Sequence, residues 1–384
     1  MTRVGVLGSP RRAEVDGRGA VTFGRGLHVD WIVGADDRWH HAVSDVAVRQ
    51  RRVGPGPALE TAMRVPSGDA LQRIYGVGGP GDVVVVEVEN ASPAPFVLGL
   101  VVRGGRELVL DEDEGVVRID GRTLLVVPRA PSRWAAGRAG AAVEVAVHGD
   151  ATDAPLTRVT ADEAVLLWPV THRTRTRVAL ALGGDVPSGG VPLAALPGIG
   201  EVAAGWSAQL RRGMEVVLPD EGLQEQIDAA RADALLAAAA GVGRGDAGLV
   251  VALEDWGFDA EAAAGWQRLG SRARREARRR VASEPWKLLH EVRERLVLER
   301  EDGAVELLRG FAPEWRGANL DVRGAPTRRG VVSYSVRWHG EHPALLWEVV
   351  DAKDPFALRA PVLDADWSTR DAAGETLLGV ARQR

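Results

Sequence analysis

The residues best suited to chemistry are Glu254 and Asp255, which stand directly before Trp256 in the string LEDW. Hydrolysis of a glycosidic bond uses two carboxyl groups, roughly 5–5.5 Å apart in retaining enzymes and 6.5–9.5 Å apart in inverting ones. The two residues are therefore candidate catalytic groups, and the Trp256 ring is a candidate binding surface for a sugar. The structural alternative is two solvated helix charges, because neighbouring helical residues project about 100° apart.

Glu314 is the third candidate catalytic residue, in the string GFAPEW. It is flanked by Phe311 and Trp315, and Trp315 is the second candidate for substrate binding. The structural alternative is a turn held rigid by Pro313, whose two large rings cover a junction between helical and β layers.

Two short strings match the residue spacing of functional motifs but lack the ligands or the secondary structure that those motifs require. In HGEH, His339 and His342 could bind a metal, but zinc needs three or four ligands and a hairpin turn accounts for the same residues. GVGGPG (76–81) has the glycine spacing of a dinucleotide-binding loop. That loop must open a helix, whereas a valine-rich strand follows here, so we expect no metal, nucleotide or other cofactor.

The basic string SRARREARRR (271–280) is the one arginine cluster. The chain carries a net charge of −5, and no aromatic stacking surface adjoins the cluster, so nucleic acid is not an expected partner. A solvated helix face, or docking to an acidic surface, explains the cluster better.

Bulk composition indicates a globular protein of two or three domains. The chain has 384 residues, of which 45% are hydrophobic and 26% charged, and it has no cysteine. Disulfides and thiolate chemistry are thereby excluded. No apolar stretch has the length of a signal peptide or a membrane span, so we expect a cytoplasmic protein without membrane contact. Its twelve tryptophans outnumber phenylalanine and tyrosine together.

The first half of the chain is typical of an antiparallel β-sandwich, which we expect over residues 1–185. In DVVVVEVEN (82–90), alternation places Val84, Val86 and Val88 on one face. Asp120-Gly121 predicts a tight hairpin. Further strands are expected at 96–102, 107–110, 116–119, 123–127, 142–147, 164–170 and 177–182.

The second half predicts a linker, helices and a return to strands. Residues 186–218 are rich in Gly and Pro and end with a short helix around Trp206. Residues 219–296 predict a helical hairpin domain, with Asp220 as the N-cap of its first helix. Residues 297–384 predict a small β-domain, in which VVSYSVRW (331–338) pairs with PALLWEV (343–349). The predicted fold class is therefore α+β.

This order of elements resembles that of the six-hairpin glycosidases, which have a sandwich, a linker helix, an (α/α)6 toroid and a closing β-domain. The similar strings are DGAVELLRGFAPEWRG, SVRWHGEHPALLWEV, LPDEGLQ, ALEDWGFDAEAA and the linker helix around Trp206. The order of elements is similar over most of the chain, but the similar sequence strings cover only about 60 residues. It implies an association with carbohydrate.

The helical region departs from that family in length. Twelve toroid helices need on the order of 190 residues, whereas 220–297 provides only 78 positions, room for about four helices. No position matches a catalytic motif of the family, so the sequence favours a carbohydrate-associated protein that has lost catalysis. Two alternatives stay open: an active intracellular glycoside hydrolase or phosphorylase, and a scaffold that binds a protein partner on its helical face.

Overall fold

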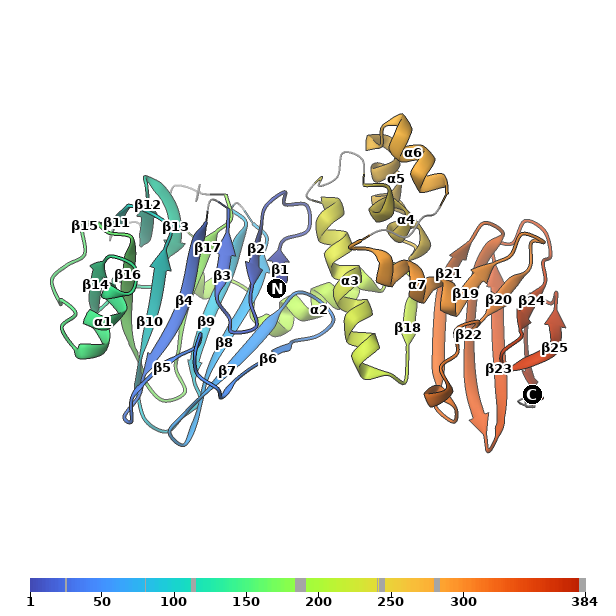
Figure 1. The fold of residues 1–384 in the computed structure, drawn as a ribbon, viewed down its shortest axis with the longest axis horizontal. Coiled ribbons are helices and arrows are strands. Elements are labelled where there is room, and N and C mark those ends of the chain that lie inside the picture. The colour runs from blue at the N-terminus through green and yellow to red at the C-terminus, as the bar shows by residue number, and fades with distance from the viewer. Residues whose placement is uncertain are drawn as a thin grey trace. The chain divides into compact units, whose positions relative to one another are not determined.

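The computed structural model describes residues 1–24, 26–79, 81–111, 115–183, 191–239, 241, 246–279 and 284–379. These residues form two compact units, Met1–Trp206 and Ser207–Arg384. The first contains two β-sheets, and the second contains five helices with two smaller sheets (Figure 1). The chain is thus an α+β protein with a large β-sandwich, a helical region and C-terminal strands, as predicted. No described helix combines the length and apolar character needed to cross a membrane.

One sheet of the sandwich has eight antiparallel strands, with β5 paired to β4 outside the main order. Leu100 lies between Trp31 and Leu166 at its centre. The strands in spatial order are β1 (Thr2–Gly5), β2 (Arg12–Val15), β3 (Val21–Phe23), β4 (Leu27–Gly34), β10 (Phe96–Arg103), β16 (Glu163–Val170) and β14 (Arg133–Gly137), with β5 (Trp39–His41).

The other sheet has nine antiparallel strands. The Asp120-Gly121 hairpin joins β12 to β13 as predicted, with positive φ at both residues. The strands in spatial order are β15 (Arg158–Thr160), β11 (Glu107–Asp111), β12 (Val116–Ile119), β13 (Arg122–Val126), β17 (Arg175–Ala181), β9 (Val83–Asn90), β8 (Gly68–Val77), β7 (Leu59–Val65) and β6 (Val48–Arg52).

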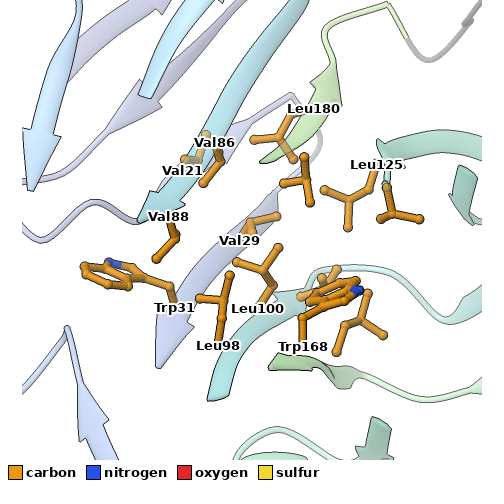
Figure 2. Close-up of a cluster of buried hydrophobic side chains, with 14 of the residues drawn as sticks. Val21, Val29, Trp31, Val86, Val88, Leu98, Leu100, Leu125, Trp168 and Leu180 are labelled. Atoms are coloured by element: carbon orange, nitrogen blue, oxygen red, sulfur yellow. The ribbon is translucent and has the colours of Figure 1, made fainter. Parts of the chain in front are cut away.

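The main core lies between these two sheets and is built from their inward-facing side chains. Val84, Val86 and Val88 of β9 all point into it, which confirms the predicted alternation. Figure 2 shows Leu98 and Leu100 between the rings of Trp31 and Trp168 within this cluster. Both rings are fully buried, and each indole N–H donates to a backbone carbonyl, so these tryptophans are structural.

The predicted strand at 142–147 is wrong, because this segment is a helix, α1 (Ala141–His148). Two glycines with positive φ, Gly140 and Gly149, bound it. Ala142 and Ala146 are one helical turn apart and pack on the outer face of the eight-stranded sheet. The small alanines allow this close packing, and the alternating valines concealed the helical spacing.

A second apolar layer covers the outer face of the nine-stranded sheet. Tyr75, Val83 and Val85 point outward from β8 and β9 and are buried. The side chains that pack over this layer come from the linker and from the predicted linker helix, observed as α2 (Ile199–Leu210). They are Val191, Leu193, Leu196, Ile199 and Val202. Leu193 lies in a short 3-10 helix, η1 (Leu193–Ala195).

The helical region contains five helices among the described residues, one more than the length estimate. They are α3 (Glu221–Ala239), α4 (Ala247–Asp255), α5 (Asp259–Arg268), α6 (Ser271–Arg278) and α7 (Lys287–Leu296). The Asp220 carboxylate accepts the Leu223 N–H at 2.9 Å, as expected of an N-cap. Gly257, with φ of +74°, allows the short joint of the α4–α5 hairpin. The string SEPW predicts Ser283 as the N-cap of α7, but this residue lies outside the described residues.

Two sheets complete the second unit. The larger has the order β18 (Glu215–Val217), β21 (Leu320–Thr327), β22 (Gly330–His339), β23 (His342–Val350) and β26 (Ala373–Leu377). The smaller has the order β19 (Val297–Glu299), β20 (Val305–Leu307), β24 (Leu358–Ala360) and β25 (Asp364–Thr369), with β20 and β24 parallel. The predicted pairing of 331–338 with 343–349 is confirmed by β22 and β23.

Candidate functional site

The candidate site is a cavity of about 510 Å³ within the second unit. It is bounded by the end of α4, one face of α7, the β19–β20 hairpin, the turn after β21 and the segment that precedes β24. Its lining residues are Asp255, His290, Arg293, Glu294, Val297, Leu298, Glu299, Arg300, Glu301, Gly303, Ala304, Val305, Arg328, Arg329, Lys353 and Asp354. The volume is within the usual range of small-ligand pockets, about 300–1,000 Å³.

An imidazole flanked by two carboxylates lies in the helical wall. His290 and Glu294 are four residues apart on α7, so they share a helix face. The His290 Nδ1 is 3.5 Å from the Asp255 carboxylate, and its Nε2 is 3.6 Å from the Glu294 carboxylate. The His290 side chain is only 13% exposed. These separations allow charge interaction with a protonated imidazole.

Arg293 joins the elements of this wall. Its buried guanidinium donates to the backbone carbonyls of Asp255, Val297 and Pro326, which belong to α4, β19 and β21. Three chain segments are thereby held together by one side chain. The three hydrogen bonds satisfy backbone carbonyls at or near the ends of these elements.

The cavity lining has as many basic as acidic side chains. The basic ones are Arg293, Arg300, Arg328, Arg329 and Lys353, and the acidic ones are Asp255, Glu294, Glu299, Glu301 and Asp354. Within the described part of the chain, the side chains of Arg328, Arg329 and Lys353 form no ion pair. No Phe, Tyr or Trp occurs among the described residues that line the cavity. The surface therefore offers both hydrogen-bond donors and acceptors without a stacking face.

The first predicted cluster is divided by the structure. Asp255 lines the cavity, whereas Glu254, its neighbour on α4, does not. Trp256 is fully buried, and its indole N–H donates to the Leu289 carbonyl at 3.0 Å. One face of its ring meets the Arg231 guanidinium at 5.3 Å. The ring is therefore part of the core and presents no face for a sugar.

The second predicted cluster lies away from the cavity lining. Glu314 is exposed on a 3-10 turn, η2 (Pro313–Trp315), and Trp315 is only 4% exposed. Phe311 contacts the Trp315 ring edge-on, with centroids 6.0 Å apart, and also approaches Trp338 of β22. The Gly310 N–H donates to the Arg295 carbonyl at the end of α7. The rings thus hold the turn against strand and helix, as the structural alternative proposed.

The remaining motifs have structural explanations. His339 and His342 face each other across the β22–β23 turn, and no metal-binding group of three or more side chains occurs among the described residues. Gly76 lies in β8, where a Cβ would come within 2.2 Å of the Gly5 carbonyl oxygen. Close strand packing therefore requires this glycine. The arginines of α6 are mostly exposed, and Arg272 pairs with Glu276 at 3.3 Å.

Sequence reasoning missed His290 and the charged hairpin opposite it. The string HEVRE carried a usable signal, since His and Glu four residues apart share a helix face. No sequence pattern indicated that β19, β20 and Lys353 line the same cavity, because tertiary packing alone brings them there. The sequence matches no known family of proteins, and no curated protein is detectably similar to it.

Proposed function

We propose that this protein is a carbohydrate-associated protein that binds a saccharide in the 510 Å³ cavity without hydrolysing it. The observation that carries the proposal is the lining itself, which combines five carboxylates with four guanidinium groups and an ammonium group. Sugar hydroxyls both donate and accept hydrogen bonds, so they match a surface that supplies both kinds of partner. Equal numbers of basic and acidic side chains favour a neutral polar ligand over a polyanion.

The resemblance to six-hairpin glycosidases supports the carbohydrate class through the order of elements. The short helical region argues against the hydrolytic activity of that family, because the five helices among its described residues are fewer than the twelve of the toroid. The candidate carboxylates also do not converge, since neither Glu254 nor Glu314 lines the cavity with Asp255.

An active glycoside hydrolase is the second candidate, and one observation favours it. Asp255 and Glu294 both approach His290, so two carboxylates lie in the same wall of the cavity. A glycoside hydrolase needs such a pair, because one carboxyl group acts as acid and the other as base or nucleophile. A scaffold function has less support, because α3–α7 present no exposed large hydrophobic side chain among their described residues.

Thermal unfolding in the presence of gluco-, galacto-, manno- and trehalose-type saccharides, with and without phosphate, tests the proposal. A saccharide at about 100 times its Kd should stabilise the protein by about 2.7 kcal/mol and raise Tm by several degrees. Mass analysis of the same samples separates the candidates. Unchanged saccharide supports binding alone, and cleaved saccharide supports the hydrolase.

Matched variants locate the binding. Arg328→Ala with Arg329→Ala removes two exposed donors from the cavity lining, and we expect the saccharide-induced rise in Tm to fall by half or more. Arg316→Ala removes an exposed arginine outside the lining and should leave the rise unchanged. No rise in Tm with any saccharide at tens of millimolar would refute the proposal for those ligands.

A further inference from the structure

A second cavity, of about 540 Å³, lies wholly within the β-sandwich. It is lined by residues before and in β2, by the segment between β3 and β4, by the β12–β13 hairpin and by the end of β17. Its volume is also within the range of small-ligand pockets. None of its residues lines the cavity assigned to a saccharide, so it requires a separate explanation.

One wall of this sandwich cavity is apolar. Ile119 and Leu124 are buried members of the main core. Phe23, Leu27 and Leu182 pack against the same core but are only partly buried. The inter-sheet core therefore continues into the cavity wall, where its last side chains keep part of their apolar surface accessible. An apolar ligand that covered them would remove this surface from water, which favours binding.

The rest of the lining is cationic. It contains Arg11, Arg12 and Arg122, and Asp120 is the one acidic side chain among the described lining residues. The Asp120 carboxylate accepts the backbone N–H groups of Arg106 and Glu107 at 3.1 and 3.0 Å. These hydrogen bonds lower the pKa of Asp120 and direct one of its oxygens toward β11.

Arg11 and Arg122 retain donors for a ligand. Arg11 uses one guanidinium nitrogen on the Gly183 carbonyl and forms no ion pair with any described residue. Arg122 is exposed, and its guanidinium forms no ion pair with any described residue. A guanidinium group binds a carboxylate through two parallel hydrogen bonds, and such charge-assisted bonds are about twice as strong as neutral ones.

We infer that the sandwich cavity binds an amphipathic anion, an acyl or aryl carboxylate whose apolar body lies on Phe23, Leu27 and Leu182 while its carboxylate meets Arg122 and Arg11. Neither the apolar wall nor the arginines alone account for the composition of the lining. A purely apolar ligand would leave Arg11 and Arg122 without an ion-pair partner among the described residues, and a small inorganic anion would leave the apolar wall in water. The inference is independent of the saccharide proposal.

Titration calorimetry of the full chain with octanoate tests it. We expect one octanoate per chain. Octanol, which lacks the charge, and acetate, which lacks the apolar body, should each bind at least about tenfold more weakly. Octyltrimethylammonium has the body with the opposite charge and should not bind. Equal affinity for octanoate and octanol, or no heat of binding with octanoate at millimolar concentration, would overturn the inference.

Reversing the charge of Arg122 tests whether octanoate binds in the sandwich cavity. Arg122→Glu should weaken octanoate binding on the order of tenfold or more, while octanol binding stays the same. Arg64→Glu is the matched control, because Arg64 is exposed on β7 outside the lining and its variant should bind octanoate as the parent does. Equal Tm values without ligand would verify that both variants fold. If Arg122→Glu bound octanoate as tightly as Arg64→Glu, the site would lie elsewhere.

Discussion

In the sandwich, buried charges meet opposite charges, whereas in Ser207–Arg384 the buried arginines mainly meet backbone carbonyls and aromatic rings. The Glu87 carboxylate, only 2% exposed as a residue, accepts from Arg73 and Arg177. Arg177 donates in addition to the carbonyls of Leu193 and Leu196, which ties the linker to the sheet.

Two buried arginines of the second unit have a different environment. Arg231 donates to the Leu210 carbonyl, stands over the rings of Trp256 and Phe258, and is 3.3 Å from Asp228. Burial lowers the pKa of its guanidinium, although the arginine remains charged at neutral pH. Arg293 joins three element ends through their carbonyls. In the sandwich, the buried charge is thus held by ion pairs between side chains of neighbouring strands. In the second unit, it is held mainly by hydrogen bonds to the backbone of separate elements.

The largest effect that this comparison predicts is that of Arg293→Leu. Three carbonyls would lose this donor, two of them in buried hydrogen bonds and one in a partly buried hydrogen bond, and each unsatisfied buried group costs about 1–3 kcal/mol. We expect the free energy of unfolding to fall by about 3–5 kcal/mol, measured by urea denaturation. Arg316→Leu is the exposed control and should change it by less than about 0.5 kcal/mol. A loss below about 1 kcal/mol for Arg293→Leu would contradict the cross-linking role.

A smaller loss is expected for Glu87→Gln in the sandwich. The variant removes the negative charge between two largely buried guanidinium groups but keeps a hydrogen-bond acceptor, so we expect about 2–3 kcal/mol. Glu89→Gln is the control at a more exposed position on the same strand, with an expected loss below about 1 kcal/mol. Equal losses in the two variants would mean that burial does not set the strength of this network.

The smallest effect concerns the pH dependence of stability at Asp45. Burial raises the pKa of this carboxyl, but hydrogen bonds from the Ala47 N–H, Arg38 and His40 outweigh it and lower the pKa to about 2. The stabilisation is therefore complete above the unfolded pKa of about 3.9 and is lost as the pH falls through about 2. It amounts to about 2 kcal/mol at pH 7.

Denaturation of the parent and of Asp45→Asn at several pH values measures this dependence. The difference in their free energies of unfolding should fall to roughly half between pH 7 and pH 3. A difference that stayed constant over this range would exclude an ionised Asp45 as its source. Asp366→Asn, at a position on β25 that is largely exposed, should show no such change.

Much of the fold was predictable because local patterns agree with the final packing. The valines of β9 alternate, Asp120-Gly121 fits a tight hairpin, and Asp220 has the side chain that an N-cap needs. The helix at 141–148 was not predictable in this way. Its valines favour a strand, and only packing of Ala142 and Ala146 on a sheet favours the helix.

The candidate site was predictable only in part. Asp255 was identified because it stands at a helix end beside a large ring, but the ring itself belongs to the core. His290 could have been found from its helical spacing to Glu294. The opposite wall comes from Glu299, Arg328 and Lys353, which are far apart in sequence and have no shared pattern. Tertiary packing alone brings such residues together.

The apolar layer on the outer face of the nine-stranded sheet has a practical consequence for handling this protein in pieces. A recombinant fragment that stops at residue 185 would leave Tyr75, Val83 and Val85 without the covering linker and α2 side chains. A broad uncovered sheet face of this kind promotes aggregation. A fragment that continues to Trp206 keeps its own cover, and so the sandwich should be expressed with that segment attached.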